Sequence, residues 1–418
     1  MTIIDRENSL IVDSEGSVRP LRVGGASCSS SLNCFQDVFG LKTIARDLFL
    51  PAGYPASVTP DYLTFQIYDS IQGLSSYIRG MLSNQSILLG LGFGNKDASI
   101  VAATLSIAAR ETIATISSLY VCSKSSSFDS HSKQWRLAAD ICNDIALTLQ
   151  ICAPFFDKHK FLIMYLLGAV CQAVTGVAGS STRMALTQHF ALQQNAANVA
   201  ACESAQETAI TAIGLLLGLL LARLSESSIP QAAIVCFIVL TYIHIHANIK
   251  AMRCLRITRL NRFRLGILFH AWLQKEQQIL VPEQVARLEP LLPGIPFLDT
   301  GPFSNIDIMI APSLDSVQRR DPAAIKRLVD VFDDAQAMHC IVQSTMKRHR
   351  IYVFLTDRGI SGEDVIRAYL DGLCMGMSAP VSQRMVARFI EALKQSPWTM
   401  DPVLLNQGSS RISLKKKE

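Results

Sequence analysis

The chain has 418 residues, of which 49% are hydrophobic and only 17% are charged, and its mean hydropathy is +0.27. Soluble domains carry about 25% charged residues, and disordered chains combine few apolar residues with a high net charge, so this composition excludes disorder and argues against an ordinary soluble enzyme. The 39 basic and 34 acidic residues give a net charge of +5, which is too balanced for a nucleic-acid-binding protein with its concentrated basic field.

The first 45 residues are polar and mixed in charge, and we expect a flexible lead there. They lack the apolar stretch of a signal peptide and the arginine-rich, acid-poor character of a transit peptide. Three prolines between residues 46 and 62 indicate an extended segment that leads onto a helix. The 11 cysteines are scattered, without a Cys-x-x-Cys pair, and several lie in apolar runs. This usage is typical of a reducing compartment.

Residues 46–250 predict a mainly α, multi-pass membrane bundle. The low charge fraction and two long apolar runs favour this over a large soluble helical bundle, which is the alternative. The runs are Ile210 to Leu221 and Ala232 to Ile245, and a helix that crosses a bilayer needs about 20 mostly apolar residues. The expected helices are 62–92, 98–122, 134–156, 161–178, 196–224 and 230–249.

Charged and polar residues interrupt these helices, and they are the candidate polar interior. Such residues are costly in lipid unless they face one another or a wet interior. Asp140 and Asp144 share a helix face through their i, i+4 spacing, and pairing with arginine is favoured over cation binding. Ser180 to Arg183 either lines a polar cavity or begins a helix. The candidate interior residues are Arg79, Arg110, Glu111, Asp140, Asp144, Arg183, Gln206 and Glu207.

Two stretches of the sequence align without a gap at a shift of 96 positions. The shift places Ala109-Arg110-Glu111-Thr112 on Ala205-Gln206-Glu207-Thr208. We therefore predict a two-fold internal repeat, with units at about 62–122 and 158–222, in which Glu111 and Glu207 are equivalent interior acids. Many transporters are built from such repeats, with the polar site between them. The alternative is that both glutamates cap helices or face neighbouring helices without binding a ligand.

Six basic residues follow the last apolar run. Basic residues beside a membrane span favour the cytosolic side and are attracted to anionic lipid headgroups. We therefore interpret residues 251–296 as a basic juxtamembrane hinge that contacts membrane lipids, in preference to a solvated helix face. No stacking aromatics are interleaved, so nucleic-acid binding is not expected. The residues are Lys250, Arg253, Arg256, Arg259, Arg262 and Arg264. The predicted location is an intracellular membrane, with the C-terminal domain in the cytosol.

Residues 297–405 predict a small α+β domain in the order β-α-β-β-α-α. A turn-rich linker at 294–302 precedes it. The expected strands are 306–311, 340–345 and 351–356, the last two joined by a basic turn, and the expected helices are 322–337, 361–374 and one after Pro380. Asp321 is placed to cap the first helix, and Ser361 with Asp364 forms a capping box for the second. Residues 406–418 are interpreted as a disordered basic tail.

Six segments carry motifs that resemble one known family. They are Phe49–Leu74, Trp135–Ala146 (WRLAADICNDIA), Thr175–Ala191 (TGVAGSSTRMALTQHFA), Ser204–Leu221, Leu260–Leu273 and Val281–Leu292. Together they resemble the root UV-B sensitive family over about residues 40–295. The resemblance implies membrane association and roles in seedling development, root responses to UV-B, auxin distribution and pyridoxal-phosphate homeostasis. Two plant members act together, which implies a homo- or hetero-oligomer with a family paralogue.

The sequence departs from the family pattern at two places. Where relatives usually read R-D-G-T-G, the chain has Arg110 to Ala114, and where they usually read A-D-V-S-A-K-D-G it has Ala197 to Ser204. Two charged positions have therefore become Asn198 and Cys202. If those charges serve the family's activity, this member has altered or lost it.

No catalytic motif is present, so we do not expect an enzyme or a cofactor. The sequence has no G-x-S-x-G, P-loop or H-E-x-x-H, and His244-x-His246 lacks the cysteine or acidic company of a metal site. The first hypothesis is a non-enzymatic membrane protein that binds or transports a small polar solute or lipid between its repeats. The alternative is a membrane-anchored adaptor whose C-terminal α+β domain recruits a partner.

Overall fold

The computed structural model describes residues 3–5, 10–12, 18–20, 41–94, 99–227, 230–274, 277–292, 302–303, 305–332, 339–344, 350–356, 360–377, 381–405 and 411–412. The chain divides into two compact units, Met1–Phe49 and Leu50–Glu418. In the first unit, where the sequence predicts a flexible lead, β1 (Ile3–Asp5), β2 (Leu10–Val12) and β3 (Val18–Pro20) pair as an antiparallel sheet, and Leu41–Phe49 forms α2. Most of the predicted linker at 294–302, the basic turn and most of the tail lie outside the described residues.

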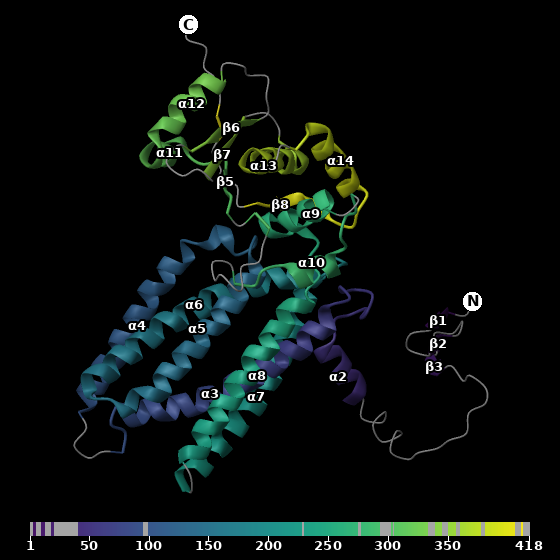
Figure 1. Cartoon of the computed structure of the whole chain (residues 1–418). Coiled ribbons are helices and arrows are strands. Elements are labelled where there is room, and N and C mark those ends of the chain that lie inside the picture. The colour runs from purple at the N-terminus through teal and green to yellow at the C-terminus, as the bar shows by residue number, and fades with distance from the viewer. Residues whose placement is uncertain are drawn as a thin grey trace. The chain divides into compact units, whose positions relative to one another are not determined.

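Six long helices dominate the second unit, as the sequence predicts (Figure 1). They are α3 (Tyr62–Gly90), α4 (Ile100–Cys122), α5 (Ser132–Cys152), α6 (Lys158–Phe190), α7 (Ala196–Ser227) and α8 (Pro230–Cys254), with short 3-10 turns η1 (Ser125–Ser127) and η2 (Ala153–Phe155). Ser99 caps α4 and Asp157 caps α6, because each side chain accepts a backbone N–H of the first turn. The mainly α fold is thus confirmed.

Helix α6 is longer than its sequence indicates. The expected end is near residue 178, but the helix continues through a Gly-Ser-Ser-Thr stretch to Phe190. Ser180 and Thr182 donate their hydroxyls to the carbonyls of Gly176 and Ala178, one turn earlier. Small polar residues therefore continue this helix, and they add a polar face to its second half.

The six helices pack as two three-helix bundles. Bundle A contains α4, α5 and α6, with α6 against both others; bundle B contains α3, α7 and α8, with α3 against both others (Figure 1). Two glycines let α7 lie close to α3. A Cβ on Gly214 would lie 2.7 Å from the Cβ of Tyr77, and one on Gly218 would lie 2.8 Å from the Cβ of Met81. A larger residue at either position would push α7 away from α3.

The helix boundaries agree with the predicted offset. Helices α3 and α6 begin 96 residues apart, at Tyr62 and Lys158, and α4 and α7 also begin 96 residues apart, at Ile100 and Ala196. The first helix of each half packs on the second and third helices of the other half. Because each half has three helices that alternate in direction, the second half runs opposite to the first (Figure 1). Duplication of an ancestral unit stays a prediction.

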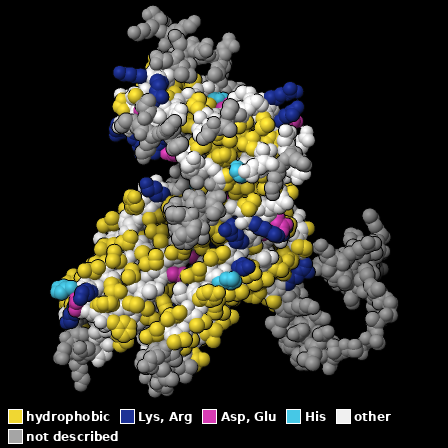
Figure 2. Space-filling model, viewed as in Figure 1, with side chains coloured by type: hydrophobic (Ala, Val, Ile, Leu, Met, Phe, Trp, Pro, Cys, Tyr) yellow, Lys and Arg dark blue, Asp and Glu magenta, His cyan; other side chains and the backbone are white. Residues whose placement is uncertain are grey.

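The outer faces of these helices are apolar. Leu105 and Leu119 of α4, Leu216 of α7 and Tyr242 of α8 are each 65–71% exposed. Figure 2 shows hydrophobic side chains over most of the face that the helices present. Within the part of the chain that the structure describes, four helices are long and apolar enough to cross a membrane: Ile100–Cys122, Lys158–Phe190, Ala196–Arg223 and Ile234–Cys254. These features support membrane association.

The rest of the second unit is the small α+β part. Its elements are β4 (Arg259–Asn261), α9 (Arg262–Gln274), α10 (Pro282–Leu288), β5 (Asp307–Ile310), α11 (Leu314–Arg320), α12 (Pro322–Phe332), β6 (His339–Gln343), β7 (Arg350–Leu355), α13 (Gly362–Gly376), α14 (Gln383–Lys394) and β8 (Thr399–Leu404). β7 is the middle strand of one sheet, parallel to β5 and antiparallel to β6. The capping box of Ser361 and Asp364 is present, and Asp321 accepts the N–H of Ala324 at 3.2 Å.

The segment expected to be a juxtamembrane hinge is divided between two hydrophobic cores. Strand β4 pairs with β8, and Leu265, Phe269 and Trp272 of α9 pack in the same cluster as Ile351 of β7. Helix α9 is buried on nearly all sides because it is apolar on nearly all sides. Residues 259–274 therefore belong to the core of the α+β part, whereas Leu255 packs in the helical cluster.

Candidate functional site

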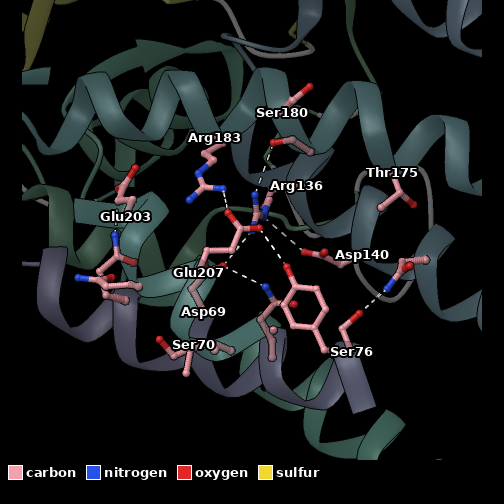
Figure 3. Close-up of a pocket in the computed structure, with 18 residues that line it drawn as sticks. Asp69, Ser70, Ser76, Arg136, Asp140, Thr175, Ser180, Arg183, Glu203 and Glu207 are labelled. Atoms are coloured by element: carbon pink, nitrogen blue, oxygen red, sulfur yellow. Dashed lines mark hydrogen bonds and ion pairs between the residues drawn. The ribbon is translucent and has the colours of Figure 1, made fainter. Parts of the chain in front are cut away.

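A polar cavity lies between bundles A and B. It has a volume of about 370 Å³ and is lined by residues of α3, α5, α6 and α7 (Figure 3). Glutamine, serine, threonine, asparagine and tyrosine side chains supply further polar groups. The charged residues that line it are Asp69, Arg136, Asp140, Arg183, Glu203 and Glu207. Several of the charges that interrupt the otherwise apolar helices therefore meet in this cavity.

Arg136 lies at the centre of the cavity wall and pairs with two carboxylates (Figure 3). Its Nη2 lies 2.9 Å from Oδ1 of Asp69 on α3, and its Nε lies 3.6 Å from Oδ2 of Asp140, one turn later on α5. The Arg136 side chain is only 14% exposed. One guanidinium therefore pairs with two acids and links bundle A to bundle B.

A second ion pair joins the bundles through α6 and α7. Arg183 pairs with Oε2 of Glu207, and Tyr77 of α3 donates its hydroxyl to Oε1 of the same carboxylate at 3.2 Å (Figure 3). Glu207 is therefore held by one charged and one neutral donor. The bundles depend on these polar contacts for their relative orientation near the cavity.

Glu203 is held differently from the other acids. It is 5% exposed and accepts hydrogen bonds from Nε2 of Gln66 at 2.9 Å and from the hydroxyl of Thr187 at 2.7 Å. No cation lies within ion-pair distance of this carboxylate among the described residues. It is a buried acid with neutral partners.

A buried ion cluster adjoins the cavity. Nη1 of Arg79 on α3 lies 2.6 Å from Oδ1 of Asp144 on α5, and Nδ1 of His244 on α8 lies 3.0 Å from the same oxygen. Arg79 also donates to the hydroxyl of Thr241 at 3.1 Å. This cluster again links bundle A to bundle B. Its histidine faces a single carboxylate, and the described residues contain no group of three or more potential metal ligands.

Apolar layers close the interface between the bundles on both sides of the cavity. Tyr62 and Phe65 at the start of α3 pack on Phe190 at the end of α6, with ring centroids 5.3 and 5.2 Å apart. Leu82, later on α3, packs in a second cluster with Leu147 of α5, which belongs to bundle A. Since the α3 residues that line the cavity lie between these positions, the cavity lies between the two layers.

Residues 37–276, more than half of the chain, match the family model described as "Vitamin B6 photo-protection and homoeostasis domain". The chain belongs to the root UVB sensitive family. It is 40% identical to the root UVB sensitive 3 protein of Arabidopsis thaliana over 281 residues, which cover 66% of this chain and 63% of that protein. It is 33% identical to RUS family member 1 of Dictyostelium discoideum over 262 residues, which cover 62% of this chain and 50% of that protein. No solved structure matches.

The chain thus spans about half to two thirds of these two relatives. The matched family region extends from before α3 to the end of α9, so it contains every residue that lines the cavity. The sheet of β5, β6 and β7 lies beyond it. The cavity is therefore part of the region that defines the root UVB sensitive family.

The structure brings most of the sequence-predicted interior residues together. Asp140, Arg183, Gln206 and Glu207 line the cavity, and Arg79 and Asp144 form the adjoining cluster. Sequence reasoning did not select Asp69, Arg136 or Glu203 as site residues. Their i, i+4 spacing could have indicated two of them, because Arg136 precedes Asp140 and Glu203 precedes Glu207 by one helical turn.

Arg110 and Glu111 lie elsewhere, on α4. Arg110 bonds to Glu111 and to Gln172, and its guanidinium lies 5.6 Å from the ring centroid of Tyr165. The Glu111 side chain is 62% exposed, whereas its aligned partner Glu207 lines the cavity. The aligned glutamates therefore have different surroundings: Glu111 pairs with its sequence neighbour Arg110, whereas Glu207 pairs with Arg183 of another helix.

The prediction that Arg264 belongs to a basic surface facing the membrane is wrong. Arg264 is 1% exposed and pairs with Glu289 at 3.0 Å, while Lys133 of α5 lies 3.1 Å from the same carboxylate. α9 carries Arg264 into the α+β core, where it cannot reach lipid headgroups. Burial raises the pKa of Glu289, but Arg264 and Lys133 more than offset this and lower the pKa to about 2.

The other basic residues of the hinge are partly or well exposed, but some have protein partners. Arg253 donates to the carbonyl oxygens of Arg287 and Glu289 at 2.9 and 2.7 Å. Lys250 and Arg256 are exposed, and Arg259 and Arg262 are intermediate. Arg256 also pairs with Glu283 at 3.5 Å, whereas Lys250 is exposed in the last turns of α8.

Proposed function

We propose that this root UVB sensitive family protein is a non-enzymatic membrane protein that binds a small polar solute in the cavity between bundles A and B and carries it across the membrane. The observation that carries the proposal is the charged cavity inside helices whose outer faces are apolar. Ionisable groups within membrane helices are costly and usually serve a substrate or ion pathway. The volume of about 370 Å³ also fits the usual size of small-molecule sites.

The arrangement of the bundles supports transport over binding alone. Transporters commonly consist of two inverted halves that move against each other around a central site. Here the cavity lies where bundle A meets bundle B, and an apolar layer closes the interface on each side. Opening one layer at a time would expose the cavity alternately to the two sides of the membrane.

The exposed basic residues suggest an orientation. Lys250 lies in the last turns of α8 and Arg256 lies two residues after its end, and basic residues at the end of a span favour the cytosolic side. We therefore propose that the end of α8 and the α+β part face the cytosol, where the exposed cations contact anionic lipid headgroups. Pairing with a family paralogue is a further proposal, to be tested by co-purification of the two chains.

The description of the matched family refers to vitamin B6, so B6 compounds are the first solutes to test. The purified chain is reconstituted into liposomes, and uptake of radiolabelled pyridoxine and pyridoxamine is measured against protein-free liposomes. We expect uptake to saturate, and Glu207→Gln to lower it by about tenfold, because the variant weakens the contact with Arg183. Glu111→Gln is the matched control, since Glu111 holds the aligned position outside the cavity.

Two results would refute the proposal. One is uptake of both compounds no faster than into protein-free liposomes. The other is equal loss of uptake in Glu207→Gln and Glu111→Gln, because this would show that the cavity has no special role. Circular dichroism of both variants checks that they keep the helical fold.

A further inference from the structure

The charges around the cavity do not balance. Arg136 pairs with both Asp69 and Asp140, but its single charge offsets only one of them, and Arg183 offsets Glu207. Among the described residues, the side chains that contact the Glu203 carboxylate through hydrogen bonds are the neutral Gln66 and Thr187. With all groups ionised, the cavity therefore has four carboxylates and two guanidiniums, and two negative charges lack a counter-ion.

The adjoining ion cluster does not supply the missing positive charge. Arg79 lies 2.6 Å from Asp144, so its charge is already paired. His244 also faces Asp144, with its Nδ1 3.0 Å from that carboxylate. Adding Arg79 and Asp144 to the balance leaves the same excess of two carboxylates. His244 is not among the residues that line the cavity, so the balance of the lining groups is unchanged.

An unpaired carboxylate in a buried position is unfavourable, because burial removes the water that would solvate it. Glu203 is 5% exposed, and its two hydrogen bonds fix it without neutralising it. A positively charged occupant of the cavity would remove this penalty. A negatively charged occupant would increase it.

The lining favours an organic cation over a bare metal ion. Among the described residues no group of three or more His, Cys, Asp or Glu side chains could hold a metal ion. Tyr77 also lines the cavity, and its hydroxyl is fixed on Glu207 at 3.2 Å. Aromatic faces bind ammonium groups through cation–π interactions. A volume of about 370 Å³ leaves room for an organic molecule attached to that ammonium.

We propose that the cavity selects small organic cations and that Glu203 is the counter-ion for the ammonium group. This inference rests on the proposed function, because it names the chemical class of solute for the same cavity. Gln66 and Thr187 then have a defined role. They hold the Glu203 carboxylate in place whether or not a solute is bound.

Three compounds that share one ring but differ in charge provide the test. Pyridoxamine, pyridoxine and 4-pyridoxic acid carry an ammonium, a neutral hydroxymethyl and a carboxylate group, respectively, at the same ring position near neutral pH. Binding to the full chain in detergent is measured by calorimetry. We expect pyridoxamine to bind about tenfold tighter than pyridoxine, and the acid to bind weakest. The preference should shrink as the pH falls, because protonation of the carboxylates removes their charge.

Variants then assign the effect to one residue. Glu203→Gln should reduce the preference for pyridoxamine over pyridoxine by about tenfold while pyridoxine still binds, and Glu111→Gln should leave the preference unchanged. Equal binding of the three compounds, or a preference for the acid, would overturn the inference while leaving the proposed function in place. Binding of none of them would refute the proposed function itself. A preference that survives in Glu203→Gln would overturn the role of Glu203.

The comparison of the three compounds on the unmodified chain does not depend on a variant. It therefore keeps the inference testable even if Glu203→Gln fails to fold. In that case Glu203→Asp is the second variant, because its side chain keeps the charge but is shorter by one methylene group. It should weaken pyridoxamine binding while retaining the order of affinities among the three compounds. A reversed order in this variant would contradict the inference.

Discussion

The buried contact of Lys133, Arg264 and Glu289 joins the helical part to the α+β part, and Glu289→Gln tests its contribution. Lys133 lies at the start of α5 and Arg264 on α9, and both approach the carboxylate of Glu289 within 3.1 Å. All three residues are at most 1% exposed. The substitution retains the shape of the side chain but removes the negative charge. Two cations are then left buried without a counter-ion.

The size of the effect follows from two arguments. Removing one partner of a buried ion pair costs about 3–5 kcal/mol. Independently, the pKa of Glu289 falls from 4.5 to about 2 on folding, which corresponds to about 3 kcal/mol of stabilisation at neutral pH. Because the folded-state pKa is the lower one, this stabilisation is complete above about pH 5 and is lost as the pH falls through the window between 4.5 and 2.

The assay is urea unfolding in a fixed detergent, followed by circular dichroism and tryptophan fluorescence. Glu289→Gln should lower the free energy of unfolding by about 3 kcal/mol at pH 7, and its difference from the unmodified chain should shrink between pH 5 and pH 3. The control is Glu283→Gln, because that side chain is 45% exposed and pairs with exposed Arg287; it should cost less than about 1 kcal/mol. A loss below about 1 kcal/mol in Glu289→Gln, or a difference independent of pH, would refute the reasoning.

Two further predictions concern helix packing and membrane insertion. Gly214→Ala places a Cβ 2.7 Å from that of Tyr77, so it should destabilise the chain by about 1–3 kcal/mol. The control is Gly80→Ala, whose Cβ meets nothing within 4 Å; it should be neutral or stabilising in the same unfolding assay. Equal effects of the two substitutions would contradict the close approach of α7 to α3. The four apolar helices should keep the chain in the membrane pellet after alkaline carbonate extraction. A thiol reagent applied from the cytosolic side should label Lys250→Cys, and labelling from the opposite side would reverse the proposed orientation.

Local sequence signals predicted the helices well, because each signal is complete within a few residues. The capping box of Ser361 and the beginnings of α3 and α7 are examples. The end of α6 was less predictable, since Ser180 and Thr182 favour turns as well as helices until their hydroxyls find a carbonyl one turn back. Here the choice depends on the helix that surrounds them.

The site was predicted in part, because charges in apolar runs are conspicuous but their partners are not. Asp140 and Glu207 were identifiable from sequence, whereas Asp69 became a site residue only through Arg136 on a distant helix. Glu111 shows the opposite case: its local sequence matches that of Glu207, but its side chain is 62% exposed. Which face of a helix contacts another helix depends on the tertiary structure. The spacing of residues in a single sequence shows which residues share a face, but it does not show which helix packs against that face.

The adaptor hypothesis, in which the α+β domain recruits a partner, would not be tested cleanly by deleting residues 297–418. Strand β8 pairs with β4, and the α+β core includes Leu260 to Trp272. Removing the C-terminal residues would therefore expose part of the hinge and the buried face of α9. Substitutions on the exposed surface of the α+β part would separate partner recruitment from loss of folding.

The first helix of each half packs on helices of the other half, and this arrangement affects the order of assembly during synthesis. Helix α3 is made first, but its packing partners α7 and α8 are made last. Its charged residues Asp69 and Arg79 pair with Arg136 and Asp144 of α5, so both ion pairs can form before α7 and α8 are synthesised. What α3 lacks until then is the close packing that Gly214 and Gly218 of α7 allow. Charge pairs can therefore hold the first half together, and helix packing completes the fold once the second half is made.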